Sequence, residues 1–290
     1  MLKFASMPST TNWFQEVHKD NHSLGMSQKQ VLFDQQSDYQ HVLIFENELY
    51  GKVLVLDGCY MLSELDEHMY HKALTTYGMQ NLPCHPEESK TTSGSPCGTE
   101  GDPNALQAQD DKLNILVVGA GDGGIVRDLL RNWAERIEKV TMVEIDQMVI
   151  DACKQHFPQV AAEFDNPKLE LKVEDALKFI KSAPDQSYDL VLCDSTDPEG
   201  FAAGLIEVDF YQSIKRVMKP SGVFCAQSGS PFLMKEELEK TQTNLAKVFD
   251  DVHTFHGPML VYPGGFWCYT AAGAKLINKN NLDMKEFVNA

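Results

Sequence analysis

Residues 113–124 read LNILVVGAGDGG, an apolar run that passes directly into a glycine-rich turn. The run is typical of a buried strand, and glycines at 119, 121 and 124 match the fingerprint of a nucleotide-binding turn between a strand and a helix. Such glycines let a ligand approach the backbone at the helix N-terminus. Glu144 ends the next predicted strand, where a carboxylate can accept hydrogen bonds from a ribose diol. We therefore expect a nucleoside ligand beside Gly119, Gly121 and Glu144.

Strands and helices continue to alternate after this turn. Apolar runs follow at 139–143, 169–173, 188–193 and 222–226. Amphipathic segments separate them near 124–134, 146–156, 174–182 and 207–217. This alternation predicts an α/β fold with a Rossmann-like, doubly wound, mostly parallel sheet. Later apolar runs at 252–255 and 266–271 are expected to close the sheet as an antiparallel pair.

The chain before this alternation has a different pattern. Short apolar runs separated by turn residues predict a small N-terminal β domain, with strands at 31–33, 41–45 and 52–56. A helical pattern follows at 65–79. We expect the β domain to cover 1–64 and a catalytic domain to cover 65–290. Residues 83–112, rich in Pro, Gly, Ser and acidic residues, are expected to form a flexible insertion.

Composition narrows the class of protein. A formal net charge of −17 argues against nucleic acid and anionic membranes as partners, and is compatible with a cationic substrate. The seven cysteines are scattered and show no metal-site spacing, so we expect a reduced protein without zinc. No apolar run reaches transmembrane length, and the N-terminus lacks a signal pattern. These features predict a soluble, cytoplasmic protein.

Two carboxylates follow the apolar run at 188–193, in the segment Asp194-Ser195-Thr196-Asp197-Pro198. The carboxyl end of a central strand opens into the ligand crevice of such a sheet. Paired carboxylates there suit a cationic ligand, or removal of a proton from one. The same residues also form good turns, so a simple turn that closes the strand is the alternative.

Asp122 and Asp175 bear on the kind of nucleoside. Asp122, inside the glycine turn, would repel a pyrophosphate at close range, whereas an adenosyl sulfonium carries positive charge and no phosphate. The alternative is that Asp122 faces solvent or caps the helix. Asp175 follows the third strand, where it can accept a hydrogen bond from an adenine amino group or simply begin a helix.

Taken together, these motifs resemble the polyamine aminopropyltransferases. The resemblance runs from about Trp13 to Ala272, apart from the insertion, and rests on residues 39–40, 56–58, 66–71, 119–124, 143–146, 194–198 and 262–265. It implies a nucleoside site formed by Gln40, Glu144 and Asp175, with Asp122 binding the amine of the aminopropyl group. It further implies that Asp194 is the catalytic base, and that the acceptor is positioned by Tyr70, His71, Asp197 and Tyr262. Tyr70 would orient the attacking nitrogen.

The implied reaction moves the aminopropyl group of decarboxylated S-adenosylmethionine to putrescine, giving spermidine and methylthioadenosine. Decarboxylated S-adenosylmethionine is a co-substrate, and neither a metal nor a resident cofactor is implied. The N-terminal β segment implies a homodimer or homotetramer. Alternatives are another amine acceptor (agmatine, cadaverine or spermidine), an AdoMet-dependent methyltransferase, and a non-catalytic protein that binds polyamines or nucleosides.

Four residues depart from the family pattern. Met61 stands where the family commonly has Gln, and Ala120 and Ala176 replace glycines. Phe201 occupies the position of a typical proline. Because Met61 and Phe201 are expected near the acceptor, they leave the identity of the acceptor open.

Overall fold

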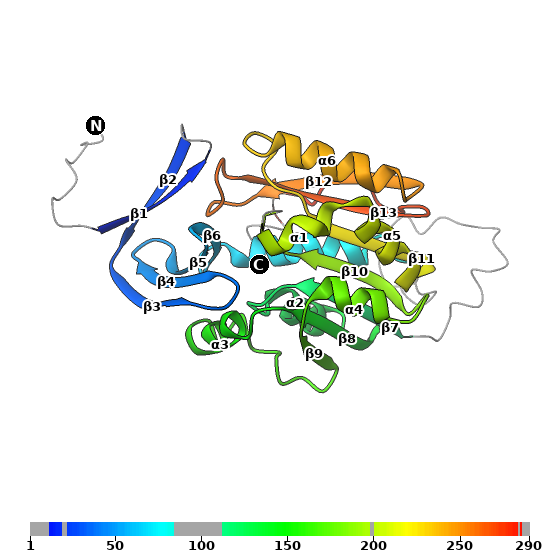
Figure 1. Cartoon of the computed structure of the whole chain (residues 1–290), viewed down its shortest axis with the longest axis horizontal. Coiled ribbons are helices and arrows are strands. Elements are labelled where there is room, and N and C mark those ends of the chain that lie inside the picture. The colour runs from blue at the N-terminus through cyan, green and yellow to red at the C-terminus, as the bar shows by residue number, and fades with distance from the viewer. Residues whose placement is uncertain (1–11, 19–21, 84–111, 198–199, 284, 286–290) are drawn as a thin grey trace.

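The computed structural model describes residues 12–18, 22–83, 112–197, 200–283 and 285. Over these ranges the chain forms one seven-stranded sheet and two smaller antiparallel sheets near the N-terminus (Figure 1). The flexible insertion expected at 83–112 lies outside the described residues, except for its two end positions. Within the described ranges, no helix is long and apolar enough to cross a membrane.

The large sheet confirms the predicted α/β architecture. Its strands are β7 (Leu113–Gly119), β8 (Ile137–Glu144), β9 (Leu169–Val173), β10 (Tyr188–Asp194), β11 (Met218–Gln227), β12 (Asp251–Pro258) and β13 (Phe266–Gly273). Their order is β12-β13-β11-β10-β7-β8-β9, with β7 to β11 parallel and the β12-β13 pair antiparallel, as expected. The chain order reverses between β7 and β10, and ligands bind at such a reversal, beyond the carboxyl ends of the strands.

Helices cover both faces of this sheet. They are α1 (Glu67–Met79), α2 (Gly124–Asn132), α3 (Gln147–His156), α4 (Ala176–Ser182), α5 (Val208–Val217) and α6 (Lys235–Ala246), with a 3-10 segment at Gly200–Ile206. Along β7, Ile115 and Val117 join the core that contains α1 and α2, whereas Leu116 and Val118 join the core that contains α4 and α5. Since successive side chains of a strand point to opposite faces, a sheet buried on both sides requires the continuous apolar runs of the sequence.

The N-terminal strands pair as β1 (Asn12–His18) with β2 (His22–Gln28), and in the order β3 (Gln30–Gln36), β4 (His41–Asn47), β5 (Gly51–Leu56) and β6 (Cys59–Ser63). Sequence analysis missed β1, β2, β6 and helix α6. In β1 the usual burial of apolar side chains and exposure of acidic ones is reversed, because Glu16 is buried whereas Trp13 and Val17 are exposed. The small antiparallel β domain was correctly expected; its boundary at residue 64 stays a prediction.

Candidate active site

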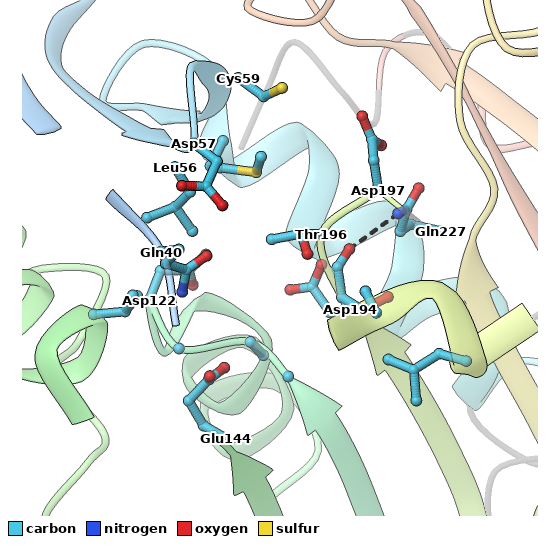
Figure 2. A pocket seen from close by; sticks show the side chains of 18 of the residues that line it. Gln40, Leu56, Asp57, Cys59, Asp122, Glu144, Asp194, Thr196, Asp197 and Gln227 are labelled. Atoms are coloured by element: carbon cyan, nitrogen blue, oxygen red, sulfur yellow. Dashed lines mark hydrogen bonds between the residues drawn. The ribbon is translucent and has the colours of Figure 1, made fainter. Parts of the chain in front are cut away.

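A cavity of about 530 Å³ opens at the carboxyl ends of β7, β8 and β10, with residues of the N-terminal strands completing its wall. Figure 2 shows Asp194, Thr196 and Asp197 on one side of it and Gln40 and Asp57 on the other. All but one of the predicted site residues line it: Gln40, Tyr70, Gly119, Gly121, Asp122, Glu144, Asp175, Asp194, Asp197 and Tyr262. His71 is the exception.

The glycine turn is pressed against the end of β10. Gly119 has a φ of +81°, and a Cβ at this position would lie 2.1 Å from the carbonyl oxygen of Asp194. The backbone N–H of Ala120 donates to that same carbonyl at 2.9 Å. A Cβ at Gly121 would lie 3.0 Å from a carboxylate oxygen of Glu144. Glycine at 119 and 121 therefore allows the ends of three strands to approach one another.

Asp194 and Tyr70 form a hydrogen-bonded pair at the cavity. Asp194 ends β10, and the Tyr70 hydroxyl, supplied by α1, donates to its carboxylate. Burial and, to a smaller extent, the charge of Asp122 raise the pKa of Asp194 to about 7, against the lowering effects of His71 and Tyr70. A carboxylate that titrates near neutrality is a more effective general base toward an amine than an ordinary Asp.

Asp122 is held in a different way. Its Oδ1 accepts from the backbone N–H of Gly124 at 2.6 Å and lies 3.3 Å from Nε2 of His71. Burial raises the pKa of Asp122, but the adjacent imidazolium outweighs burial and lowers it. The carboxylate accepts from the first residue of α2, as the helix-start alternative expected, and it also lines the cavity, while its contact with a cationic nucleoside stays a prediction.

His71 lies behind Asp122 and is 2% exposed. Its Nδ1 is 2.6 Å from Oε2 of Glu67, so both ring nitrogens face carboxylates. Burial disfavours the imidazolium, yet Asp122 and Glu67 outweigh this and raise the pKa of His71 well above its usual value. This geometry gives His71 contact with Asp122 and not with the cavity, contrary to the direct acceptor contact that the resemblance implied.

Ligand atoms of His71, Asp122 and Asp194 all lie within 4.8 Å of one another, a spacing that a metal ion could also use. Metal binding would require His71 to lose the proton that Asp122 and Glu67 favour, because coordination needs a free nitrogen lone pair. The ionised Asp122 and the partly titrating Asp194 are instead suited to an ammonium group.

The predicted nucleoside residues each have a protein partner. Glu144 Oε1 accepts from the backbone N–H of Asp146 at 2.9 Å, and burial raises the pKa of Glu144 to about 7. Gln40 Nε2 donates to Oδ2 of Asp146 at 3.0 Å, which ties the start of β4 to the end of β8. Asp175 caps α4 by accepting from the backbone N–H of Leu177 at 2.8 Å. The helix-start interpretation of Asp175 is therefore correct, while its contact with an adenine stays a prediction.

Tyr262 and Met61 form another part of the wall. The Tyr262 hydroxyl donates to the backbone carbonyl of Met61 at 2.8 Å, and the Tyr262 ring lies edge-on to Tyr70 with ring centres 5.6 Å apart. Met61 itself lines the cavity. Aromatic rings, a thioether and the carboxylates of Asp194 and Asp197 thus line one cavity, whose wall is both acidic and apolar.

Several residues that line the cavity were not predicted from the sequence, among them Glu16, His18, Gln227 and Trp267. Glu16 is buried, with its Oε2 accepting from the backbone N–H of Tyr60 at 2.9 Å and its Oε1 2.6 Å from Nε2 of His18. Burial raises the pKa of Glu16 to about 7. Gln227 Nε2 donates to the carbonyl of Ser195 at 3.0 Å, the dashed contact of Figure 2, and so fixes the segment after β10. An acidic residue amid the strand-like run NWFQEVH is the one signal that could have revealed Glu16.

Known proteins match the chain over most of its length. The family model described as spermine/spermidine synthase domain matches residues 104–284, and that of the spermidine synthase tetramerisation domain matches 12–64. A polyamine aminopropyltransferase of Prochlorococcus marinus (strain MIT 9215) is 35% identical over 280 residues, which cover 96% of this chain and 88% of that protein.

Two further proteins bear on the substrates. A spermine synthase of Arabidopsis thaliana is 36% identical over 244 residues, covering 84% of this chain and 59% of that protein. The crystal structure of a spermidine synthase in complex with the transition-state analogue AdoDATO matches with a TM-score of 0.81 and 27% identity. That match covers 99% of this chain and 94% of the other.

Proposed function

Because the chain belongs to the spermine and spermidine synthase family of polyamine aminopropyltransferases, we propose that it transfers the aminopropyl group of decarboxylated S-adenosylmethionine to putrescine. The products would be spermidine and methylthioadenosine. The observation that supports this proposal most strongly is the cavity that Asp122 and the hydrogen-bonded pair of Asp194 and Tyr70 line together. Such a cavity can bind two cationic reactants and remove a proton from one of them.

On this proposal the donor lies along the glycine turn. Its adenosine would contact Gln40, Glu144 and Asp175, which line the cavity at the start of β4 and at the ends of β8 and β9. Its ammonium would pair with Asp122, which the neighbouring imidazolium keeps ionised. S-adenosylmethionine carries an additional carboxylate at this end, which Asp122 would repel. Asp122 thus favours the decarboxylated donor and argues against the methyltransferase alternative.

The chemical step then joins two bound substrates. The amine nitrogen attacks the methylene group beside the sulfonium, so that a C–N bond forms, the C–S bond breaks and its electron pair stays on sulfur. An amine with a pKa near 10.4 must first lose a proton, at a cost of roughly 4–5 kcal/mol near neutrality. Asp194 can take that proton, and Tyr70 orients the nitrogen. Holding both reactants in one cavity adds the gain from proximity.

Acceptor length is set by where the far ammonium finds a partner. With Asp194 at the reacting end, the remaining carboxylates of the wall include Asp197 and Glu16. An acceptor of unsuitable length leaves one ammonium desolvated and unpaired, which costs more than a lost methylene contact. Acidic groups at more than one place in the wall support a diamine as acceptor.

A second candidate is the same transfer to a longer or more apolar amine. Met61 favours it, since a thioether lines the cavity where the family commonly has an amide. The 36% identity to a spermine synthase over 84% of this chain is also compatible with a longer acceptor.

The test is incubation of the purified protein with decarboxylated S-adenosylmethionine and diamines of three to six carbons, together with agmatine and spermidine. Product masses identify the transfer, and steady-state kinetics rank the acceptors. We expect putrescine to exceed 1,3-diaminopropane and cadaverine in kcat/KM by more than about tenfold. A preference for another amine would reject putrescine but keep aminopropyl transfer. Absence of any aminopropyl product would reject the enzyme class, with S-adenosylmethionine as donor testing the methyltransferase.

A further inference from the structure

A chain of alternating charges connects the cavity to the interior between α1 and α2. The guanidinium of Arg127 on α2 donates two hydrogen bonds to the carboxylate of Glu67 on α1, at 2.7 and 2.9 Å, and so forms a bidentate ion pair. Glu67 in turn lies 2.6 Å from Nδ1 of His71, whose other nitrogen faces Asp122 at 3.3 Å. Only Asp122 of these four residues lines the cavity.

These residues are buried and closely packed. The side chains of Arg127 and His71 are 8% and 2% exposed, and that of Glu67 is 12% exposed. A Cβ at Gly124 would lie 2.2 Å from the His71 ring, so the ring is fixed against the first turn of α2. Burial raises the pKa of Glu67, but His71 and Arg127 outweigh it and hold that pKa at about 2.

We propose that Glu67 and Arg127 are positioning residues of the donor site, which act through His71 to hold the Asp122 carboxylate ionised and aimed at the donor ammonium. This inference rests on the proposed function, because it takes the ammonium of decarboxylated S-adenosylmethionine as the group that Asp122 binds. Burial disfavours the imidazolium of His71, and Glu67 supplies the second of the two carboxylates that favour its charge. Arg127 fixes the orientation of Glu67, since a guanidinium and a carboxylate joined by two parallel hydrogen bonds have a defined geometry.

A simple structural role for the same contacts makes a different prediction. If Arg127 and Glu67 only joined α1 to α2, their loss would affect every ligand of the cavity equally or none. A positioning role affects only ligands that carry the ammonium. Methylthioadenosine lacks the aminopropyl group, so the ratio of its dissociation constant to that of decarboxylated S-adenosylmethionine separates the two roles.

The experiment compares Arg127→Met and Glu67→Gln with wild type by calorimetric titration of both ligands. We expect each variant to bind decarboxylated S-adenosylmethionine about tenfold more weakly, as is typical when the partner of a ligand-binding side chain is removed. Binding of methylthioadenosine should stay within about twofold. The matched control is Arg131→Met, which removes a half-exposed cation of the same helix, paired with Glu163 at 3.3 Å, and should behave like wild type.

The near-isosteric Glu67→Gln decides the question if Arg127→Met does not fold. Folded variants that keep the full wild-type preference for the ammonium-bearing ligand overturn the inference alone. A wild-type protein that shows no such preference overturns both the inference and the proposed function.

Discussion

The segments that follow β7 and β10 each bring a carboxylate to the same cavity, yet they support those carboxylates differently. Asp122, after β7, pairs with His71 and with the backbone of α2, and its pKa is lowered. Asp194, at the end of β10, has the neutral Tyr70 hydroxyl as its side-chain donor, and its pKa rises to about 7. The surroundings of these two aspartates thus shift their pKa values in opposite directions.

On the proposed function, this difference in pKa would let two neighbouring acids divide binding from catalysis. An ionised carboxylate with a cationic partner is a poor base but a good site for an ammonium group. A carboxylate near neutrality can accept a proton and release it again within one turnover. The charge of Asp122 also raises the pKa of Asp194, so on the proposed function the donor-binding carboxylate would increase the basicity of the catalytic one.

The largest effect is expected for Asp194→Asn. Asn keeps the shape of the side chain but cannot take up the proton, and loss of a general base typically lowers the rate by ~10²–10⁴. Affinity for methylthioadenosine should be unchanged, because the adenosine is bound elsewhere in the cavity. Kinetics and calorimetry check both statements, and turnover within about twofold of wild type would mean that Asp194 is not the base.

The pH dependence of kcat/KM is the next largest effect. Asp194 acts as base only when ionised, so kcat/KM should rise with pH and level off above about 7, the pKa of this group in the free enzyme. Below that value the rate should change about tenfold per pH unit. The Tyr70 hydrogen bond lowers the pKa of Asp194. Tyr70→Phe should therefore shift the rising part of the pH–rate profile to higher pH, and it should also slow the reaction. A flat profile between pH 5 and 8 would contradict the assignment.

At Asp122 the expected effect is on the choice of donor. Asp122→Asn should weaken binding of decarboxylated S-adenosylmethionine by about 10–100-fold, the usual range for loss of a hydrogen bond between charged groups. The affinity of this variant for decarboxylated S-adenosylmethionine should exceed that for S-adenosylmethionine by a smaller factor than in wild type. The reason is that the carboxylate of S-adenosylmethionine is no longer repelled by a negative charge at position 122. Competitive calorimetry measures both ligands, and an unchanged affinity ratio would place donor selection elsewhere.

Much of the fold was predictable because buried parallel strands need continuous apolar runs. The position of Asp194, Glu144 and the glycine turn then follows from the rule that ligands bind at the carboxyl ends of such strands. Glu16 was not predicted from the sequence, because β1 buries this acid and exposes the apolar Val17. His71 was misplaced for a geometric reason. Successive helical residues point about 100° apart, so with Tyr70 directed at the cavity, His71 turns toward α2.

The smallest effect is expected in the glycine turn itself, at Ala120. Its φ of +65° strains an alanine by about 1–2 kcal/mol, which Ala120→Gly would relieve. The same change removes a buried methyl group worth about 0.8 kcal/mol and increases the freedom of the unfolded chain by a further ~0.4–1 kcal/mol. The free energy of unfolding should therefore stay within about 1 kcal/mol of wild type. Gly119→Ala provides the contrast, because its Cβ would collide with the Asp194 carbonyl and push apart the two segments that carry the two acids. Chemical denaturation should show a much larger loss of unfolding free energy for Gly119→Ala than for Ala120→Gly. Equal losses would show that the contact with β10 is not what requires glycine at position 119.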